Sequence, residues 1–196
     1  MKRNIFVFIG APASGKGTRI KKLEERGYKS ISTSSILKEQ GYDLSKGTLI
    51  NDSIVSGLVI SRINILKDKN IILDGFPRTM NQFEELRKRG IRIDKVFYIK
   101  VSKEIIIERA KDRLTCSKCQ ASFTKSNFKR PQIEGICDYC GGKLIERPDD
   151  REELLEKRLE EYLEKTKPIL EEFSKYDIPI ITIDANLNPE EVLKYI

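Results

Sequence analysis

The feature that most constrains the fold is a short apolar segment that leads directly into a glycine-rich turn. Residues 4–9, NIFVFI, form a nearly continuous apolar run, which is typical of a strand buried on both faces of a parallel sheet. The turn that follows over residues 10–18 reads GAPASGKGT and leads into a helical pattern. Such a turn points backbone N–H groups and the positive end of a helix at one spot, where a polyphosphate can bind. We therefore expect a phosphate-binding loop between the first strand and the first helix.

Further short apolar runs alternate with helical patterns along the rest of the chain. The runs cover residues 70–73, 95–101 and 178–183, and the helical patterns cover residues 16–26, 81–89, 103–112 and 151–175. Pro168 is expected to bend the last and longest helix. This alternation predicts an α/β fold, a three-layer P-loop architecture in which helices cover both faces of a parallel sheet. Ligands of such folds bind beyond the carboxyl ends of the strands.

Two stretches do not follow the alternation, and we interpret them as insertions. Residues 32–61 are rich in Ser and Gly, with short helical pieces around Thr48–Ser56 and Val59–Leu66. Residues 113–149 contain all four cysteines and few helical signals. The predicted division is a core of residues 1–31, 62–112 and 150–196 that carries one insertion at 32–61 and another at 113–149.

The composition excludes several kinds of chemistry. The 196 residues include no histidine, which rules out Ser-His-Asp and Cys-His catalysis, histidine-ligated zinc and an imidazole proton shuttle. The chemistry therefore depends on Lys, Arg, Asp, Cys or the backbone. The net charge of +7 is compatible with nucleic acid, a membrane surface or phosphorylated small molecules, and equally with an ordinary basic surface. The apolar runs are too short to span a membrane, so no membrane partner is expected.

Within the predicted phosphate loop, Lys16 is the residue that would reach the β and γ phosphates of a nucleotide as a point charge. The spacing matches GxxxxGK, but Gly17 stands where Ser or Thr is usual, and Thr18 follows it. The exchange removes the hydroxyl that ordinarily binds magnesium directly. An ordinary glycine turn between a strand and a helix is the alternative interpretation.

A second candidate anchor follows the apolar run at residues 70–73. The chain continues from Asp74 as DGFPRT, with Gln82 one helical turn further on. An acidic residue at the carboxyl end of a core strand is where nucleotide enzymes place the carboxylate that orders magnesium or its waters. Arg78 would project into the same crevice, where its planar fork suits phosphate. Taken alone, Asp-Gly is a turn signal and Arg78 is a surface charge, so this assignment depends on the phosphate loop.

The four cysteines have the spacing of a metal site. Cys116 and Cys119 form one CxxC pair, Cys137 and Cys140 form another, and 17 residues lie between the pairs. Four thiolates at this spacing can close a tetrahedron around zinc, and no histidine is available to replace one. Disulfides, or another metal such as iron, are the alternatives. Because a zinc knuckle is also a common nucleic-acid-binding element, a nucleic-acid-binding protein is a rival interpretation of this basic chain.

Together, the segments GxPxxGKGT and DGFPRTxxQ resemble the paired signature of the adenylate kinase family, and the resemblance extends over essentially the whole chain. It implies that ATP is bound by Ala13, Ser14, Gly15, Lys16, Gly17 and Thr18. It implies an AMP site that contains Thr33, Lys38, Gly57, Leu58, Val59, Gly75, Phe76, Pro77, Arg78 and Gln82. In that site Thr33 and Gln82 would contact adenine. The family has Gly-Asp where this chain has Ser34-Ser35, and Arg where it has Lys38, which replaces a bidentate clamp by a point charge.

The cysteine segment resembles the zinc-bearing lid of many prokaryotic adenylate kinases, from RLTCSKC to CDYCGGKLIERPDDREELLEKRLEEY. The resemblance implies a structural zinc in a lid that closes over ATP, with Ser122 and Phe123 beside the nucleotide. It also matches Asn186 to a backbone contact with adenine. Two local departures are Gln120 in place of a glycine and the unusual residues at 110–112. Residues 32–61 would correspondingly be the insertion that binds the nucleoside monophosphate.

The resemblance assigns phosphate contacts to four arginines. Arg109 and Arg113 match residues that contact the donor phosphates. Arg147 and Arg158 match residues that clamp both nucleotides. The expected catalytic set is Lys16, Asp74, Arg78, Arg109, Arg113, Arg147 and Arg158. A simpler role is expected for the acidic pair that precedes the long helix. Asp149 or Asp150 would cap this helix, with Glu153 completing a capping box from Asp150.

The activity that the resemblance implies is reversible phosphoryl transfer, in which MgATP and AMP give two ADP. Zinc in the lid and magnesium with ATP would be the cofactors. The alternatives are a kinase for CMP, UMP or several nucleoside monophosphates, or a zinc-knuckle nucleic-acid-binding protein. A cytoplasmic location is expected from the nucleotide loop, the cysteine pattern and the lack of a convincing signal segment. We expect a monomer, although apolar positions in residues 189–196 leave a homo-oligomer open.

Overall fold

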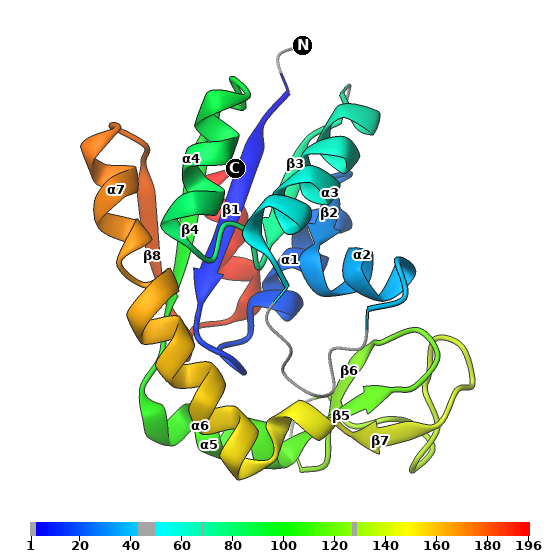
Figure 1. The fold of residues 1–196 in the computed structure, drawn as a ribbon. Coiled ribbons are helices and arrows are strands. Elements are labelled where there is room, and N and C mark those ends of the chain that lie inside the picture. The colour runs from blue at the N-terminus through cyan, green and yellow to red at the C-terminus, as the bar shows by residue number, and fades with distance from the viewer. Residues whose placement is uncertain (1–2, 43–49, 68, 127–128) are drawn as a thin grey trace.

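A parallel sheet forms the centre of the molecule (Figure 1). The computed structural model describes residues 3–42, 50–67, 69–126 and 129–196. The strands lie in the order β2 (Lys29–Ser32), β3 (Ile71–Asp74), β1 (Ile5–Gly10), β4 (Lys95–Lys100) and β8 (Ile180–Asp184). Every neighbouring pair is parallel, and Phe8 of β1 lies opposite Asp74 of β3. The predicted α/β fold is confirmed.

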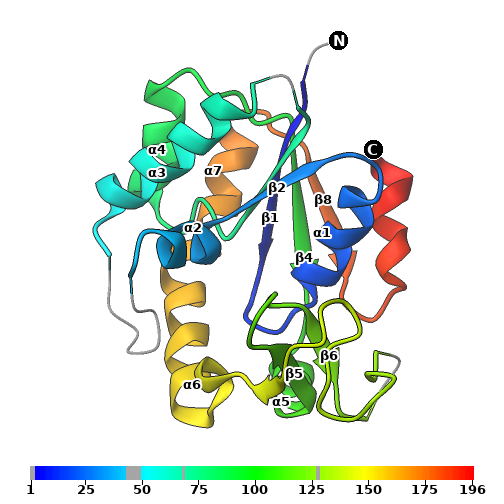
Figure 2. The same cartoon turned by 90° about the vertical axis from the view of Figure 1, so that its right-hand side faces the viewer.

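Helices cover both faces of this sheet (Figure 2). One face carries α1 (Lys16–Glu24) and the C-terminal 3₁₀ helix η3 (Pro189–Tyr195). The other face carries α3 (Asp52–Ile65), α4 (Met80–Lys88) and α7 (Ile169–Lys175). The molecule therefore has the three layers that a doubly covered parallel sheet requires.

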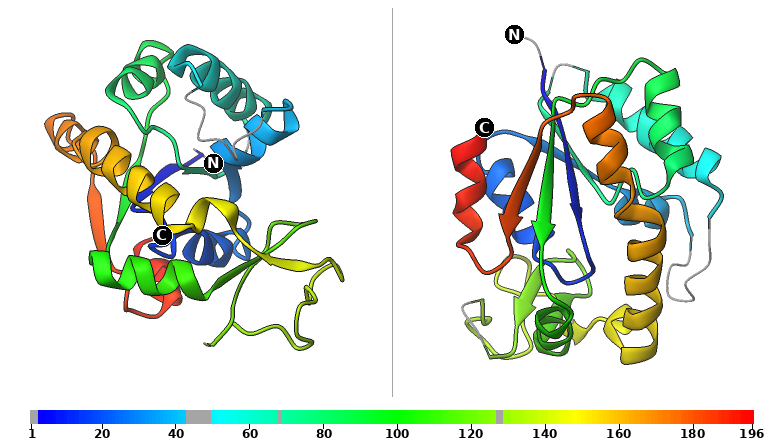
Figure 3. Two further views of the ribbon diagram at one scale, coloured as in Figure 1. Left: turned by 60° about the horizontal axis from the view of Figure 1, so that its bottom comes forward. Right: turned by 90° about the vertical axis from the view of Figure 1, so that its left-hand side faces the viewer.

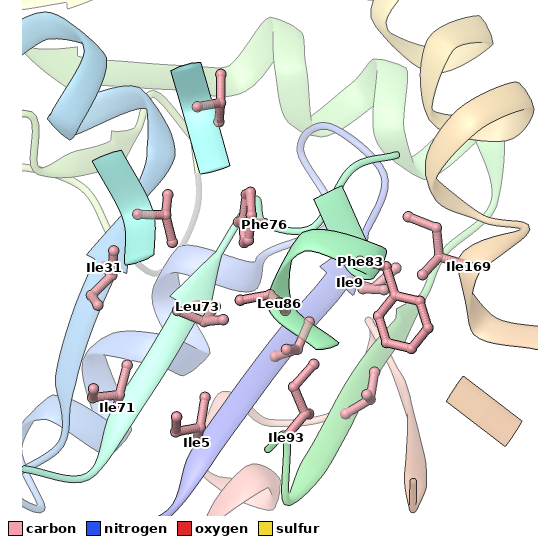
Figure 4. Close-up of a cluster of buried hydrophobic side chains, with 14 of the residues drawn as sticks. Ile5, Ile9, Ile31, Ile71, Leu73, Phe76, Phe83, Leu86, Ile93 and Ile169 are labelled. Carbon is pink, nitrogen blue, oxygen red and sulfur yellow. The ribbon is translucent and has the colours of Figure 1, made fainter. Parts of the chain in front are cut away.

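Strand β1 is buried along its whole length and contributes to both halves of the core. Ile5 and Ile9 lie in the larger cluster together with Phe83 of α4 (Figure 4). The alternate residues Phe6 and Phe8 belong to the second cluster, beneath α1. This alternation follows from the two-residue period of a strand. Each such buried side chain contributes roughly 1.5–3 kcal/mol to the free energy of unfolding.

The long C-terminal helical pattern forms three consecutive segments. They are α6 (Glu152–Glu161), a π-helical turn η2 (Tyr162–Thr166) and α7. Pro168 directly precedes α7, and the chain changes direction between α6 and α7 (Figure 3). Because proline has no N–H to donate, the helical ladder is interrupted there, and the predicted bend is confirmed. Among the described residues, no helix is both long enough and apolar enough to cross a membrane.

The cysteine segment forms a small antiparallel sheet that projects from the core (Figure 3). Its strands lie in the order β6 (Ser122–Thr124), β5 (Arg113–Cys116) and β7 (Leu144–Glu146). Strand β5 continues directly from α5 (Lys103–Asp112), and the short 3₁₀ helix η1 (Pro148–Asp150) leads from β7 to α6. The segment thus leaves and rejoins the core at elements that follow β4.

Helix α3 is continuous where the sequence predicted two separate pieces on either side of Gly57. Val55, Val59 and Ile63 recur at intervals of four and are buried on one face of this helix. Burial of this face outweighs the poor helix propensity of Gly57, which alone costs about 1 kcal/mol relative to Ala. Position 48, where the first predicted piece begins, lies outside the described residues.

Outside the cysteine segment, strand β2 and helix α2 (Thr33–Glu39) were not expected from the sequence. Strand β2 lies at one edge of the sheet and buries only Ile31, so it lacks the continuous apolar run of a central strand. Helix α2 begins directly after β2 and buries Ile36 and Leu37. Both elements lie beside the predicted boundary of the first insertion. The predicted second boundary, between positions 61 and 62, falls inside α3.

Candidate active site

Segments at the carboxyl ends of all five parallel strands line one cavity of about 1870 Å³. The phosphate loop follows β1, Thr33 follows β2, and Asp74 ends β3. Strand β4 leads into α5, which carries Arg109, and β8 leads to Asn186. This edge is where parallel α/β sheets bind ligands. Because β1 and β3 are neighbours, the phosphate loop and Asp74 open into the cavity side by side.

Most of the predicted site residues line this cavity. They are Ala13, Ser14, Gly15, Lys16, Gly17, Thr18, Thr33, Lys38, Asp74, Gly75, Pro77, Arg78, Gln82, Arg109, Arg113, Ser122, Phe123, Arg147, Arg158 and Asn186. Among the predicted nucleotide-binding residues, four do not line it, namely Gly57, Leu58, Val59 and Phe76. Val59 and Phe76 are buried in the core, whereas Gly57 is exposed on α3. The phosphate loop and the predicted arginines therefore line one cavity, whereas residues 57–59 of α3 do not.

The phosphate loop combines a left-handed glycine with a lysine that folds back over the loop. Gly15 has a φ of 88° at the N-terminus of α1, a conformation that residues with a Cβ rarely adopt. Lys16 Nζ donates hydrogen bonds to the carbonyl oxygens of Gly10 and Ala11 at 2.6 and 2.9 Å. The ammonium group is thus held at the mouth of the loop, at the end of β1.

Positive charge surrounds Lys16. Burial lowers the pKa of Lys16 to about 7, although the carboxylate of Asp74 opposes this shift. Arg78, Arg158 and Arg113 lower the pKa further because each adds positive charge nearby. A polyphosphate in the cavity would favour the charged form of Lys16 and would be attracted by the same cations.

The segment after β3 is held in a hydrogen-bond network. The Nε of Arg78 and the Oγ1 of Thr33 both donate to the Gly75 carbonyl at 2.9 Å. Gln82 Oε1 accepts from the backbone N–H of Arg78 at 2.7 Å, and Gln82 Nε2 donates to Asp52 Oδ1 at 2.7 Å. The amide of Gln82 therefore has a fixed orientation.

Asp52 lines the cavity but was not among the predicted site residues. In the sequence it has the pattern of an ordinary acidic residue in the first turn of a helix, which is also its place in α3. Its carboxylate accepts from Thr79 Oγ1 at 2.7 Å in addition to Gln82. Only the packing of α3 against α4 reveals that it orients Gln82.

Two adjacent aspartates organise the arginines between the cysteine segment and the core. Arg113 Nε donates to Asp150 Oδ2 at 2.6 Å, and Arg147 Nε donates to Asp149 Oδ1 at 2.7 Å. Arg158 Nη1 donates to the Asp149 carbonyl at 2.8 Å and lies 3.0 Å from the Asp149 carboxylate. Burial alone would raise the pKa of Asp149, but Arg147 and Arg158 hold this pKa below its ordinary value. The three cations are therefore kept close together at the cavity wall.

The prediction that Asp149 or Asp150 caps the long helix is wrong. Both residues belong to η1, and Arg151 occupies the N-cap position of α6 without a side-chain hydrogen bond. Water can solvate an exposed helix terminus, whereas charge-assisted bonds to arginines are stronger than a neutral cap. Glu153, the expected partner in the capping box, is exposed.

Two positions that depart from the adenylate kinase signature contact one another. Lys38 Nζ donates to Gln120 Oε1 at 3.0 Å, although 82 positions separate the two residues in the chain. Gln120 Nε2 donates to the backbone carbonyls of Cys116 and Ser117 at 3.3 Å each. Gln120 has a φ of 60°, a conformation that a glycine adopts more easily. The contact joins α2 to the cysteine segment across the cavity.

The four cysteine sulfurs form a compact cluster. All four Sγ atoms lie within 4.8 Å of one another, and the thiols are free. Tetrahedral zinc with bonds of about 2.3 Å would place its sulfur ligands about 3.8 Å apart. The backbone N–H of Cys119 donates to Cys116 Sγ at 3.4 Å, and this bond is the main cause that lowers the pKa of Cys116 to about 6. A Cβ added at Gly142 would lie 2.8 Å from Cys116 Sγ, so the cradle requires glycine. The cluster fits a metal ion held by thiolates.

The chain is similar to adenylate kinases over most of its length. A family model described as adenylate kinase matches residues 8–178. The adenylate kinase of Fervidobacterium nodosum is 36% identical in an alignment of 207 positions, which covers 96% of this chain and 93% of that relative. The adenylate kinases of Caldicellulosiruptor saccharolyticus and Pyrococcus horikoshii are 40% and 38% identical; the alignments cover 90% and 96% of this chain and 90% and 91% of the relatives. The chain therefore belongs to the adenylate kinase family.

Proposed function

We propose that the protein transfers the γ-phosphoryl group reversibly from MgATP to AMP, so that two ADP are formed. The observation that carries this proposal is the meeting of two phosphate anchors in one cavity. The loop after β1 suits a polyphosphate, and the Asp74–Arg78 segment after the neighbouring strand β3 suits a monophosphate. Two anchors on adjacent strands allow the donor and acceptor phosphates to approach each other in line.

The proposed catalytic groups are cations and one carboxylate that line this cavity. They are Lys16, Asp74, Arg78, Arg109, Arg113, Arg147 and Arg158. The phosphate oxygen of AMP is already ionised, so the reaction needs no general base, in agreement with a sequence that contains no histidine. Catalysis then depends on holding the two phosphates in place and on neutralising the charge of the transferred group.

On the donor side, we propose that residues 13–18 hold the ATP phosphates and that Ser122, Phe123 and Asn186 lie beside the nucleoside. Asp74 is half-buried at the end of β3, where its carboxylate supplies the oxygen ligands that magnesium or its waters prefer. Bound with ATP, magnesium would neutralise part of the phosphate charge. Asp74 is the residue that would hold the magnesium or its waters.

On the acceptor side, we propose that Thr33 and Gln82 recognise adenine and that Lys38 faces the acceptor phosphate. The network that fixes Gln82 supports a role in base recognition, because a directional amide can discriminate between bases. Val55 of α3 lines the cavity. We propose that Gly57, Leu58 and Val59, which follow it on the same helix, contact AMP through their backbone. Gly75 and Pro77 line the acceptor side of the cavity, and Phe76 between them is buried and supports them from the core. Arg78, Arg147 and Arg158 would contact the acceptor phosphate.

For the cysteine segment, we propose a structural zinc held by Cys116, Cys119, Cys137 and Cys140, in a lid of residues 113–149. The short distances among the four sulfurs and the small size of the surrounding apolar cluster support this role. Atomic emission on freshly purified protein would measure one zinc per chain; iron or no metal would contradict the proposal. The four cysteines form no disulfide, and thiolates that hold a metal are typical of a reducing compartment. We therefore propose a cytoplasmic location.

The decisive test of the function is a coupled assay for ADP with AMP, CMP, UMP and GMP as acceptors. We expect AMP to give the highest kcat/KM. A second candidate is a kinase of broader acceptor range, and the engagement of Lys38 by Gln120 favours it, because Lys38 is then less available to the acceptor phosphate. Comparable kcat/KM values for AMP and CMP would establish this broader function.

We further propose that the positive charge serves nucleotides and not nucleic acid, because many of the basic side chains line the cavity. A binding titration with single-stranded RNA at two salt concentrations tests this, since nucleic-acid binders lose affinity steeply with salt. Tight, salt-dependent RNA binding together with absent ADP formation would support the zinc-knuckle alternative. We propose a monomer, which light scattering on the purified protein would measure directly.

A further inference from the structure

Arg19, in the first turn of α1, is among the most buried side chains of the molecule. Only 2% of it is exposed, although arginine is almost never fully buried without a paired charge. Within the described residues, no carboxylate forms an ion pair with Arg19. Its guanidinium donates instead to backbone carbonyls. The identity of these carbonyls indicates what the buried charge does.

The guanidinium of Arg19 connects the phosphate loop to the turn that follows β8. Nη2 donates to the Leu187 carbonyl at 2.9 Å and shares its hydrogens with the Asp184 and Ala185 carbonyls at 3.2 Å each. Nη1 lies 3.5 Å from the carbonyl of Gly15 in the phosphate loop. The turn and the loop are far apart in the sequence but line the same cavity. The side chain of Arg19 therefore bridges the two segments.

Arg109 forms a second connection between the same two segments. Its Nη2 donates to the Ala185 carbonyl at 2.9 Å and its Nη1 donates to the Ser14 carbonyl at 3.3 Å. A Cβ added at Gly15 would lie 3.0 Å from Arg19 Nη1 and 3.6 Å from Arg109 Nη1, so both guanidiniums pack against the loop. Two adjacent cations repel each other, and burial adds to the cost. An arrangement this unfavourable indicates a positional role.

Asn186 lies between the carbonyls that Arg19 holds. The backbone N–H of Asn186 donates to Asp184 Oδ1 at 2.8 Å. Its carbonyl oxygen accepts no hydrogen bond from the part of the chain that the structure describes, whereas the carbonyls of 184, 185 and 187 all accept from Arg19. Asn186 also lines the cavity. A free carbonyl at this point can accept the exocyclic amine of adenine, whereas guanine carries an oxygen at the same ring position.

We propose that Arg19 is a positioning residue for the nucleotide donor. It fixes the turn at residues 184–187 against the phosphate loop and thereby sets the distance from the phosphate site to the Asn186 carbonyl. The inference rests on the proposed function, because it takes ATP as the donor. Arg19 acts through the turn, so its loss affects recognition of the donor base and leaves the acceptor site unchanged.

The test compares Arg19→Gln and Arg19→Lys with the unaltered enzyme. In Arg19→Gln, KM for ATP should rise about tenfold or more, which is the scale of losing a charge-assisted hydrogen bond. The preference for ATP over GTP, measured as a ratio of kcat/KM values, should fall, while KM for AMP stays within about twofold of its original value. Arg19→Lys keeps the charge but loses the planar fork, and should restore the preference only in part.

Leu86→Ala is the matched control, because Leu86 is fully buried in α4, on the face of the sheet opposite to α1 and Arg19. It should lower the melting temperature without changing the preference for ATP over GTP. If Leu86→Ala lowers this preference as Arg19→Gln does, or if Arg19→Gln leaves KM for ATP unchanged, the inference is overturned. Should Arg19→Gln fail to fold, the dissociation constants of Arg19→Lys for ATP and GTP give the same decision. Absent ADP formation by the unaltered enzyme would refute the proposed function itself.

Discussion

The parallel core and the cysteine-bearing sheet are stabilised in different ways. The core contains two clusters of buried apolar side chains, one on each face of the sheet. The sheet of β5, β6 and β7 has a single small cluster, whose buried members are Cys116, Phe123, Cys137 and Leu144. Half of these members are candidate metal ligands. The stability of the core is thus distributed over many side chains, whereas that of the cysteine sheet would depend on the proposed metal site.

The same contrast applies to the charges of the candidate active site. The phosphate loop is part of the rigid core, since β1 is buried along its whole length. Arg113 and Arg147, in contrast, lie on or beside the cysteine sheet and are held by Asp150 and Asp149. Of the six cations proposed for catalysis, three are held by hydrogen bonds to backbone carbonyls of the core, namely Lys16, Arg78 and Arg109. The other three, Arg113, Arg147 and Arg158, are held by ion pairs with Asp149 and Asp150. We therefore expect that each region can be disturbed without the other.

Loss of the metal should have the largest effect and should be confined to the cysteine sheet. We expect Cys119→Ser, or treatment with a strong chelator, to remove hydrogen-exchange protection from β5, β6 and β7, while β1 and β4 keep theirs. A structural zinc site contributes ~10–16 kcal/mol of apparent binding energy, more than the small apolar cluster can replace. The measurement is hydrogen exchange by mass spectrometry. The control is Ser117→Ala, in the same turn. Equal loss of protection in β1 would show that the two regions are not independent.

Lys16→Met should have the next largest effect, on catalysis and not on the fold. We expect kcat/KM to fall about 10³-fold, since the cation that stabilises the transferred charge is lost. The melting temperature should stay the same or rise, because burial lowers the pKa of Lys16 and charging this group in the folded state is unfavourable. A kinetic assay and a thermal melt measure both. Lys22→Met, in the same helix but not lining the cavity, should be fully active. Near-normal activity of Lys16→Met would contradict the phosphate-loop assignment.

Asp150→Asn tests the ion pairs that connect the two regions. The Asp150 side chain is 4% exposed, and breaking a buried ion pair costs about 3 kcal/mol or more in the free energy of unfolding. Misplacement of Arg113 should also lower kcat, by about 10- to 100-fold. Denaturant unfolding and steady-state kinetics measure the two effects. Glu153→Gln is the control, because Glu153 would contribute to stability only if Asp149 or Asp150 capped the helix. Equal effects of the two substitutions would favour the capping interpretation.

Lys38→Arg should have the smallest effect, on the acceptor alone. An arginine can bind phosphate through two parallel hydrogen bonds, so we expect KM for AMP to fall about threefold while KM for ATP is unchanged. Gln120→Gly, which removes the partner of Lys38, should also lower KM for AMP. Lys88→Arg, on the exposed part of α4, serves as the control. If KM for AMP is unchanged in both variants, Lys38 does not face the acceptor phosphate.

The parts of the molecule that were predicted correctly have local signals. The continuous apolar run of β1 and the spacing of the phosphate loop each lie within about ten neighbouring residues. The predicted helix at residues 103–112 has the bounds of α5. Strand β2 was missed because an edge strand buries one residue, Ile31, and thus has no apolar pattern. Helix α3 was divided in the prediction because Gly57 is a local signal that packing overrides.

The contacts that define the candidate site were harder to predict, because their partners are distant in the sequence. Gln82 and Asp52 are 30 positions apart, Arg113 and Asp150 are 37 apart, and Arg19 lies 165 positions from Asp184. Aspartates before a helix have the same local pattern whether they cap the helix or bind arginines. The local pattern therefore led to the wrong role for Asp149 and Asp150.

The amino-acid sequence by itself determined the α/β alternation, the phosphate loop, the four-cysteine spacing and the absence of histidine chemistry. These features depend on residue type, period and spacing along a short stretch of chain. Only the tertiary structure decided which charges meet, which glutamine is oriented by Asp52, and which carbonyl Arg19 leaves free. Hydrogen bonds and ion pairs are directional and act over a few ångströms, so they depend on where the folded sheet places the ends of its strands.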